Sequence, residues 1–176
     1  MTRIIPAILL TFLSSATLAE TKPAPPPPAP ARCAGPEYRQ FDFWIGRWKV
    51  SSTRDGSAQG DSLIERQYDG CTLRENWRDP QLTGGSLNTY VATDGKWHQL
   101  WTDSSGAWRE FTGGLQGGDM VLIATYPSRR KPGSTAQEKM TFTPNPDGSV
   151  RQHMTKSSDG VTWVEGYDYT YRRAAD

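Results

Sequence analysis

Glu75 and Trp77 are the first residues whose types and spacing suggest chemistry. They are two positions apart, so an extended chain would place both side chains on one face. A carboxyl group buried beside an indole loses hydration, its pKa rises, and it can act as a general acid or base. Glu75 is therefore the catalytic candidate, for a cofactor-free isomerase or hydrolase. The alternative is a structural carboxylate paired with one of three arginines: Arg74, Arg78 or Arg109.

A second set of residues places an amide between indoles. Gln99 lies two residues from both Trp97 and Trp101, and Asp103 continues the same alternation. An apolar wall with a few polar anchors is typical of a small-molecule pocket. If these faces point inward, we expect them to hold a small, mostly apolar or aromatic molecule; outward-facing rings covering the surface are the alternative. The expected ligand-binding residues are Trp44, Glu75, Trp77, Gln99, Trp101 and Tyr169.

The sequence contains few residues suited to metal binding or to nucleophilic catalysis. His98 and His153 are the only histidines, and neither belongs to a metal-binding spacing such as HExxH. We expect both to be partly exposed strand residues. The Gly-x-Ser-x-Gly element of many serine hydrolases is also absent from the sequence. The sequence therefore predicts no metal site.

Cys33 and Cys71 are the only cysteines. In an exported protein such a pair is expected to form a disulfide. Closing a loop of this length stabilises the fold by about 4 kcal/mol on the chain-entropy model. The alternatives are metal ligation and thiol chemistry, which lack a CxxC motif and a neighbouring histidine.

The elements that must position these residues are short and separated by turns. Nine signals built on Gly, Asn, Asp or Pro, residues typical of tight turns, divide the chain from Phe41 onward. The segments between them alternate with period two, and none shows convincing helical periodicity. The ten expected strands are Phe41–Thr53, Asp61–Tyr68, Thr72–Trp77, Ser86–Ala92, Lys96–Asp103, Trp108–Thr112, Met120–Tyr126, Glu138–Thr143, Val150–Lys156 and Thr162–Tyr171.

Short strands joined in sequence by short turns form an antiparallel meander. A meander of this length usually avoids exposed edges by closing on itself. The sequence therefore predicts an all-β fold, an up-and-down antiparallel barrel of about ten strands. A two-sheet sandwich is the alternative.

The beginning of the chain has a different composition. Residues 1–19 combine Arg3, a short apolar run and a small-residue end, which is the order of a secretory signal peptide. The run is shorter than the roughly 20 apolar residues of a transmembrane helix, so we expect no integral membrane segment after its removal. Residues 20–32 contain six prolines and predict a disordered tether. The barrel domain is expected to span residues 33–176 of a periplasmic or secreted protein.

The charge balance bears on the partners. The chain has 20 Lys and Arg against 19 Asp and Glu, and residues 1–19 contain only Arg3, so the remainder is formally neutral. A neutral domain has no general electrostatic attraction for nucleic acid, which we do not expect as a partner. A third hypothesis, beside ligand binding and catalysis, is an interaction module of the cell envelope that uses the tether and an aromatic outer face.

The segment 41–50 resembles the first strand of the lipocalin-like calycin barrels. In that family a Gly-x-Trp element places its tryptophan across the closed end of the barrel, and an arginine of the last strand often stacks on the ring. The resemblance implies a structural latch here, formed by Gly46 and Trp48 with Arg172 or Arg173.

A closer resemblance is to a family of exported bacterial proteins of unknown function with the same barrel. Four segments carry it, 41–48, 70–77, 95–101 and 159–163, and it covers nearly all of residues 33–173. It implies the fold and names no reaction. Haem-binding barrels of the nitrobindin type also resemble this first strand and use a histidine near the C-terminus. Because the nearest histidine, His153, lies one strand too early, we predict no cofactor, with haem bound through His153 as the alternative.

Overall fold

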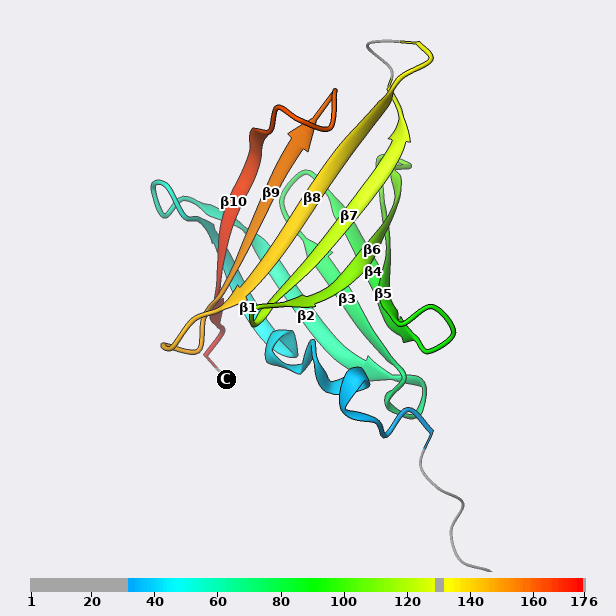
Figure 1. Cartoon of the computed structure of the whole chain (residues 1–176). Coiled ribbons are helices and arrows are strands. Elements are labelled where there is room, and N and C mark those ends of the chain that lie inside the picture. Colours follow the sequence, from blue (N-terminus) through cyan, green and yellow to red (C-terminus); the bar gives the residue numbers. More distant parts are fainter. Residues whose placement is uncertain (1–31, 129–131, 176) are drawn as a thin grey trace, which may run out of the picture. The chain divides into compact units, whose positions relative to one another are not determined.

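A computed structural model describes residues 32–128 and 132–175. Ten antiparallel strands follow one another around a closed barrel, in which β1 also pairs with β10 (Figure 1). This confirms the all-β up-and-down barrel and excludes the sandwich. The elements are η1 (Pro36–Arg39), η2 (Asp42–Trp44), β1 (Gly46–Ser52), β2 (Ala58–Gln67), η3 (Tyr68–Gly70), β3 (Thr72–Arg78), β4 (Thr83–Val91), β5 (Lys96–Asp103), β6 (Trp108–Gln116), β7 (Asp119–Pro127), β8 (Thr135–Pro144), β9 (Val150–Ser157) and β10 (Val164–Arg173).

The expected signal peptide, residues 1–19, and all but the last residue of the expected tether, residues 20–32, lie outside the described part of the chain. Within the described part, no helix has the length and apolar character needed to cross a membrane.

The chain enters the barrel differently from the prediction. The sequence predicts one strand over Phe41–Thr53, whereas the structure has the 3-10 helix η2 and then β1, which begins at Gly46. Phe41 and Trp44 are three residues apart, so a helical turn places both rings on one side. There they stack with centroids 4.9 Å apart, and both are fully buried. A strand would have sent them to opposite faces, with one in solvent.

Residues 33–45, which we call the plug, cross one end of the barrel (blue, Figure 1). Two indole N–H groups hold it in place. Trp48 Nε1 donates to Trp44 O over 2.8 Å, and Trp97 Nε1 donates to Gln40 Oε1 over 3.1 Å. This closed end contains the largest buried rings of the protein, Phe41, Trp44, Trp48, Trp97, Phe142 and Tyr171. Each large apolar side chain buried in this way contributes about 1.5–3 kcal/mol.

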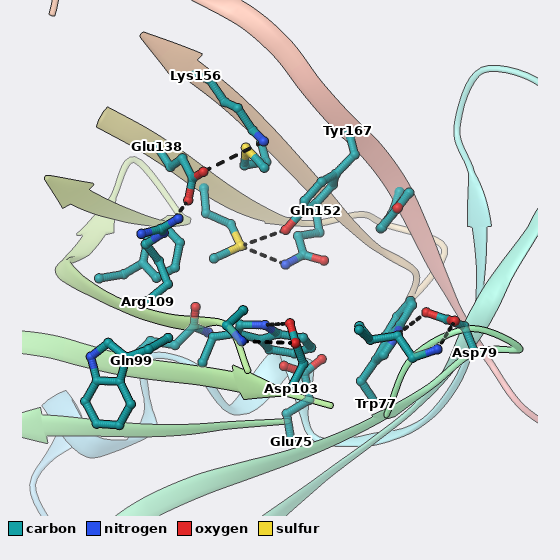
Figure 2. A pocket seen from close by; sticks show the side chains of 18 of the residues that line it. Glu75, Trp77, Asp79, Gln99, Asp103, Arg109, Glu138, Gln152, Lys156 and Tyr167 are labelled. Atoms are coloured by element: carbon teal, nitrogen blue, oxygen red, sulfur yellow. Dashed lines mark hydrogen bonds and ion pairs between the residues drawn. The ribbon is translucent and has the colours of Figure 1, made fainter. Parts of the chain in front are cut away.

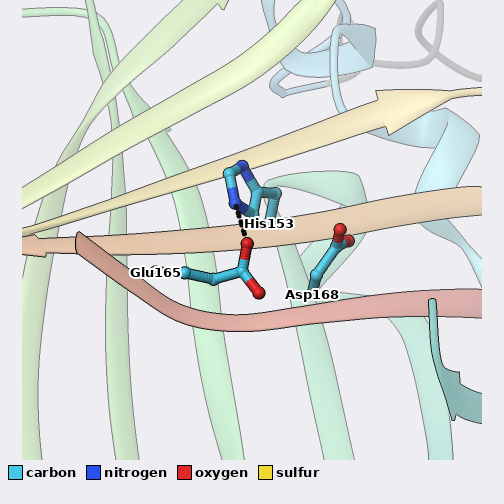
Figure 3. Close-up of side chains that lie close together, drawn as sticks. All are labelled: His153, Glu165 and Asp168. Atoms are coloured by element: carbon cyan, nitrogen blue, oxygen red, sulfur yellow. Dashed lines mark ion pairs between the residues drawn. The ribbon is translucent and has the colours of Figure 1, made fainter. Parts of the chain in front are cut away.

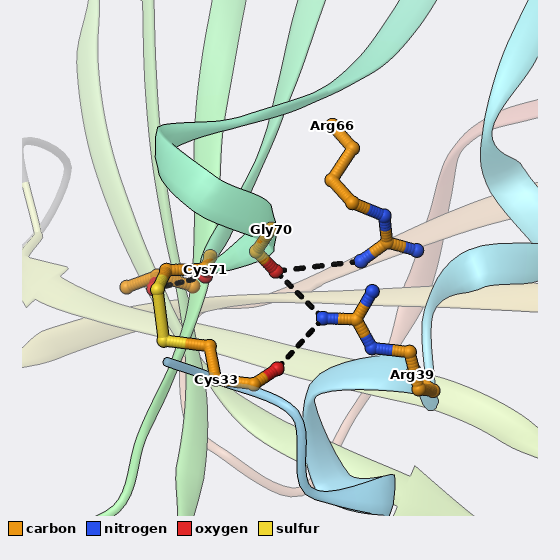
Figure 4. The surroundings of a disulfide bond; sticks show 6 residues. Cys33, Arg39, Arg66, Gly70 and Cys71 are labelled. Atoms are coloured by element: carbon orange, nitrogen blue, oxygen red, sulfur yellow. Dashed lines mark hydrogen bonds between the residues drawn. A yellow bond between two sulfur atoms is a disulfide. The ribbon is translucent and has the colours of Figure 1, made fainter. Parts of the chain in front are cut away.

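A disulfide between Cys33 and Cys71 joins the start of the plug to the connection between β2 and β3 (Figure 4). Arg39 Nη2 donates to Cys33 O over 2.8 Å and to Gly70 O over 2.7 Å. Arg66 donates to the same Gly70 carbonyl over 3.4 Å. The plug is thus fastened to the barrel by the disulfide and by the hydrogen bond from Arg39 to the Gly70 carbonyl. The disulfide suggests an oxidising, extracytoplasmic environment.

A cation–π contact closes the seam between the first and last strands. The Arg173 guanidinium lies 4.0 Å from the centroid of the Trp48 ring, and its Nη1 donates to Ile45 O over 2.6 Å. Gly46 has φ +144°, and a Cβ there would overlap the Arg173 guanidinium, so this position requires glycine. The ring partner is therefore Arg173 and not Arg172, because Tyr171 points inward and the alternation of β10 turns Arg172 outward.

Candidate ligand-binding site

The other end of the barrel interior, which we call the open end, is hollow. A cavity of about 380 Å³ lies between the strands and reaches the connecting loops at Asp79, Leu82 and Ala107 (Figure 2). Of its 19 lining residues, seven are aromatic and eight are polar or charged. The principal rings are Trp77, Trp101, Trp108, Phe111, Tyr167 and Tyr169.

Two walls of the cavity repeat one construction, a tryptophan followed two residues later by an aspartate. Trp77 Nε1 donates to Asp79 Oδ2 over 2.7 Å in one, and Trp101 Nε1 donates to Asp103 Oδ2 over 2.8 Å in the other (Figure 2). The second oxygen of each carboxylate accepts backbone N–H groups of the turn that follows. Each indole is therefore held in orientation by a turn.

These hydrogen bonds also keep both aspartates ionised. The indole of Trp77 is the main cause of a lowered pKa at Asp79, and turn N–H groups add to it. At Asp103 burial opposes ionisation, but hydrogen bonds from Ser105 and Trp101 outweigh it and lower the pKa. Both carboxylates are thus negatively charged at neutral pH.

A glycine on the adjacent strand gives each of these indoles its space. A Cβ added at Gly60 of β2 would lie 2.7 Å from Trp77 Cζ2, and one at Gly84 of β4 would lie 2.9 Å from Trp101 Cζ2. Because carbon atoms do not approach so closely, each ring packs directly against backbone. Both positions therefore need glycine for the walls to keep their shape.

The Trp77 ring belongs to an aromatic stack. It lies parallel to Tyr169, with centroids 6.2 Å apart and an interplanar angle of 8°. Tyr169 in turn stacks on Tyr167 at 4.5 Å and 15°. Trp101 borders the cavity and stacks on no other ring of the described residues. One wall is therefore a preassembled aromatic surface, and Trp101 supplies a single ring.

A connected group of buried polar side chains forms the floor. Glu75 is 4% exposed and accepts hydrogen bonds from Ser62 Oγ and Ser86 Oγ, both over 2.9 Å. Asn88 Nδ2 donates to Ser86 Oγ over 2.9 Å, and Gln99 Nε2 donates to Asn88 Oδ1 over 2.6 Å. Each donor in this chain is directed toward the Glu75 carboxylate, and hydrogen bonds in such a chain polarise one another.

Burial raises the pKa of Glu75 to about 7, although the hydroxyls of Ser86 and Ser62 work in the opposite direction. The arginine partner that the structural alternative assumed is absent among the described residues. Arg74 and Arg78 are exposed on the outside of β3, and Arg109 pairs with Glu138, its Nε lying 3.0 Å from Oε2. Glu75 is thus a buried carboxyl group held by neutral donors only.

Both basic side chains of the cavity pair with Glu138. Besides Arg109, it accepts a hydrogen bond from Tyr126 Oη over 2.9 Å and lies 3.8 Å from Lys156 Nζ. The Arg109 guanidinium lies 3.8 Å from the centroid of the Tyr126 ring. This group was not predicted from the sequence. The two-residue spacing of Glu138 and Met140, both lining residues, is the signal that could have found it.

Of the six predicted ligand-binding residues, the structure brings five to the cavity: Glu75, Trp77, Gln99, Trp101 and Tyr169. Their role in binding stays a prediction. Trp44 lies elsewhere, because η2 turns its ring into the closed end, where it packs on Phe41 and Phe142. This corrects its assignment to the pocket.

His153 lies on the outer face of β9, while its neighbours Gln152 and Met154 line the cavity. Its side chain therefore points away from the interior. Haem held in the cavity through His153, the alternative that the sequence left open, does not fit this arrangement.

His153, Glu165 and Asp168 approach one another on that outer face, their ligand-type atoms lying within 4.8 Å (Figure 3). Arginines already occupy both carboxylates. Arg54 lies 2.9 Å from Glu165 Oε1, and Arg151 holds Asp168 with two hydrogen bonds of 2.8 and 2.7 Å. Two guanidinium groups beside the cluster would repel a cation, so these residues form an ionic network and do not suit a metal.

Comparison with protein-family models and with curated proteins finds no match to the chain. The functional conclusion therefore rests on the fold and on the cavity.

Proposed function

We propose that the protein binds a small, mostly apolar molecule in the open end of its barrel, in contact with Glu75, Trp77, Gln99, Trp101 and Tyr169. The observation that carries the proposal is the aromatic-walled cavity of about 380 Å³ above a floor of buried polar groups. Small-ligand sites combine apolar and aromatic walls with polar side chains that orient the ligand.

We further propose that the protein is an exported member of the calycin-type barrels, with residues 1–19 as its signal peptide and 20–32 as its tether. The closed ten-stranded barrel and the Arg173 guanidinium on Trp48 support the family. The disulfide supports export. In such a protein the cavity would hold its ligand outside the cytoplasm.

Native mass spectrometry of the full chain, purified from its exported compartment, tests the binding function. We expect an additional mass that is released on denaturation and identified, after extraction, as a mostly apolar compound. A protein that carries nothing and also takes up no apolar fluorescent probe would contradict the proposal.

A second candidate function, a cofactor-free isomerase or hydrolase, is supported by one observation. Glu75 lines the cavity, and burial places its pKa near 7, where a carboxyl group both gives and takes protons at neutral pH. Once the ligand is known, Glu75→Gln separates the two functions. Normal binding with loss of turnover would establish catalysis, and the absence of turnover in the native protein would exclude it.

The third hypothesis, an envelope interaction module, relies on the tether and on an aromatic outer face. All but the last residue of the tether lie outside the described part of the chain. Among the described residues the one strongly exposed tryptophan, Trp108 at 61%, stands at the cavity rim, where it would serve a ligand as well as a partner. The ligand-binding proposal therefore accounts for more of the structure.

A further inference from the structure

The lining of the cavity contains more acid than base. Four carboxylates and two basic side chains line it. Both basic groups, Arg109 and Lys156, lie against the same carboxylate, that of Glu138, at 3.0 and 3.8 Å. With all six groups ionised, four negative and two positive charges leave the lining with a net charge of −2. The carboxylates of Glu75, Asp79 and Asp103 have no basic partner among the described lining residues, so their part of the cavity is electronegative.

Glu75 differs from the two aspartates in what surrounds it. Asp79 and Asp103 are bound by indole and turn N–H groups near solvent. Glu75 is buried, and the donors that reach it are neutral hydroxyls. The serine hydroxyls stabilise the ionised form of Glu75, whereas burial destabilises it. A positively charged partner, which would favour the ionised carboxylate further, is lacking.

The titratable groups that face Glu75 from β10, across the barrel interior, do not supply that charge. They are the phenols of Tyr167 and Tyr171. Burial, reinforced by the charge of Glu75, raises the pKa of both, so both remain neutral. The strands on either side contribute the serines Ser62 and Ser86. A cation can therefore reach Glu75 only from the cavity.

The walls above Glu75 suit a cation attached to a flat apolar body. Trp77, Tyr169 and Tyr167 form a parallel stack, and Trp101 borders the same space. The faces of aromatic rings attract cations electrostatically and also pack against planar apolar groups. The two basic side chains of the lining, Arg109 and Lys156, already pair with Glu138.

We propose that the ligand carries one protonated amine on a planar, mostly apolar body, and that this ammonium group binds the Glu75 carboxylate at the floor of the cavity. The proposal rests on the proposed binding function and adds the chemical class of the ligand. The cation enters as the missing partner of Glu75, the rings enclose the apolar body, and Asp79 and Asp103 maintain a negative potential at the entrance.

Binding is then coupled to the proton of Glu75. An ammonium group favours the ionised carboxylate, so binding displaces the proton in the fraction of molecules in which Glu75 is protonated. Affinity rises with pH through the titration of Glu75 and becomes constant above it. A ligand without charge shows no such rise.

Three naphthalene probes of similar shape test the proposal on the full-length exported protein: 2-naphthylmethylammonium, 2-naphthylmethanol and 2-naphthoate. At pH 8, where Glu75 is mainly ionised, we expect the ammonium to bind about tenfold more tightly than the alcohol, as hydrogen bonds to charged groups allow. The carboxylate probe should bind most weakly. The advantage of the ammonium should shrink between pH 8 and pH 5.5.

Two variants sharpen the test. Glu75→Gln should remove the advantage of the ammonium probe and leave the affinity of the alcohol within about twofold of its original value. Glu165→Gln, which removes the same charge from the outer face, should change neither affinity. If Glu75→Gln does not fold, the pH series on the native protein decides the question alone.

The outcomes separate the two proposals. Equal or tighter binding of the alcohol or the naphthoate would overturn the ammonium proposal and leave the binding function standing. A pH-independent preference for the ammonium would also overturn the role of Glu75. Failure of all three probes to bind would overturn both.

Discussion

Tryptophans occupy both ends of the barrel interior, but they have different neighbours. At the closed end, the side chains of Trp44, Trp48 and Trp97 are at most 2% exposed and pack on other rings. At the open end, Trp77 and Trp101 are half-buried, and aspartates of the adjacent turns fix their N–H groups. The same residue type thus fills space at one end and surrounds space at the other.

The two ends also treat polar groups differently. At the closed end, the indole N–H groups of Trp48 and Trp97 donate to residues of the plug, whereas the buried Trp44 Nε1 has no hydrogen-bond partner among the described residues. Below the open end, Glu75 is desolvated with no opposite charge beside it. A protein usually avoids leaving a carboxyl group in that condition. The comparison teaches that stability is concentrated at the closed end, and that the open end retains features whose cost a ligand would offset.

Replacing one tryptophan at each end should break the comparison most strongly. Trp44→Ala removes a fully buried ring, so we expect a loss of about 3–5 kcal/mol in the free energy of unfolding. Trp101→Ala removes a half-buried ring beside an existing cavity and should cost less than half as much. Chemical denaturation of both variants measures the difference. Equal losses would show that the two ends are not energetically distinct.

Removing the disulfide loosens the closed end alone. The double variant Cys33→Ser, Cys71→Ser should unfold with a free energy lower by about 4 kcal/mol, because a long loop is released in the unfolded chain. The loss should appear as a lower denaturation midpoint under non-reducing conditions. Probe binding at the open end should survive under conditions in which the variant remains folded. A variant that is as stable as the native protein would contradict the role given to the plug.

Glu75→Gln should reveal the cost of the buried carboxyl group through its pH dependence. Folding raises the pKa of Glu75 from 4.5 to about 7. Between these values the folded state keeps a proton that the unfolded state has lost, so native stability falls as pH rises, by about 3 kcal/mol in total. The glutamine variant lacks this fall. Denaturation curves from pH 4 to 8 should therefore diverge, and parallel curves would refute the desolvated carboxylate.

The smallest expected effect concerns the latch at the closed end. Arg173→Ala removes a cation–π contact and a hydrogen bond to Ile45 O, and we expect it to lower the free energy of unfolding by about 1 kcal/mol. Arg172→Ala is the matched control and should be neutral. The order would be reversed if Arg172 were the partner of Trp48.

Local patterns were sufficient to predict the barrel. Turn residues and period-two alternation depend on a few neighbouring positions, so the strands could be predicted without the structure, as could the faces that Glu75 shares with Trp77 and Gln99 with Trp101. Whether these faces point inward was left open by the sequence. The plug could not. Phe41 and Trp44 fit a strand as well as a turn, and burial against Phe142, a hundred residues away in sequence, decides between the two.

The candidate site was predictable residue by residue but not as an arrangement. Which arginine lies near which carboxylate depends on strand register around the barrel, and register is set by pairing across the whole sheet. From the sequence, Arg74, Arg78 and Arg109 were equal candidates for a partner of Glu75, whereas in the structure Arg109 lies beside Glu138. The paired Trp-x-Asp units could have been noticed in the sequence, but their glycine partners lie on other strands.

We expect a ligand to bind at the open end, while the closed end only stabilises the fold. The indole N–H resonances of the seven tryptophans test this expectation directly by NMR, because each reports its own position in the barrel. Titration with 2-naphthylmethylammonium should shift the resonances of Trp77 and Trp101 and leave those of Trp44, Trp48 and Trp97 unchanged. Shifts confined to the closed-end tryptophans, or no shift at saturating probe, would contradict the account.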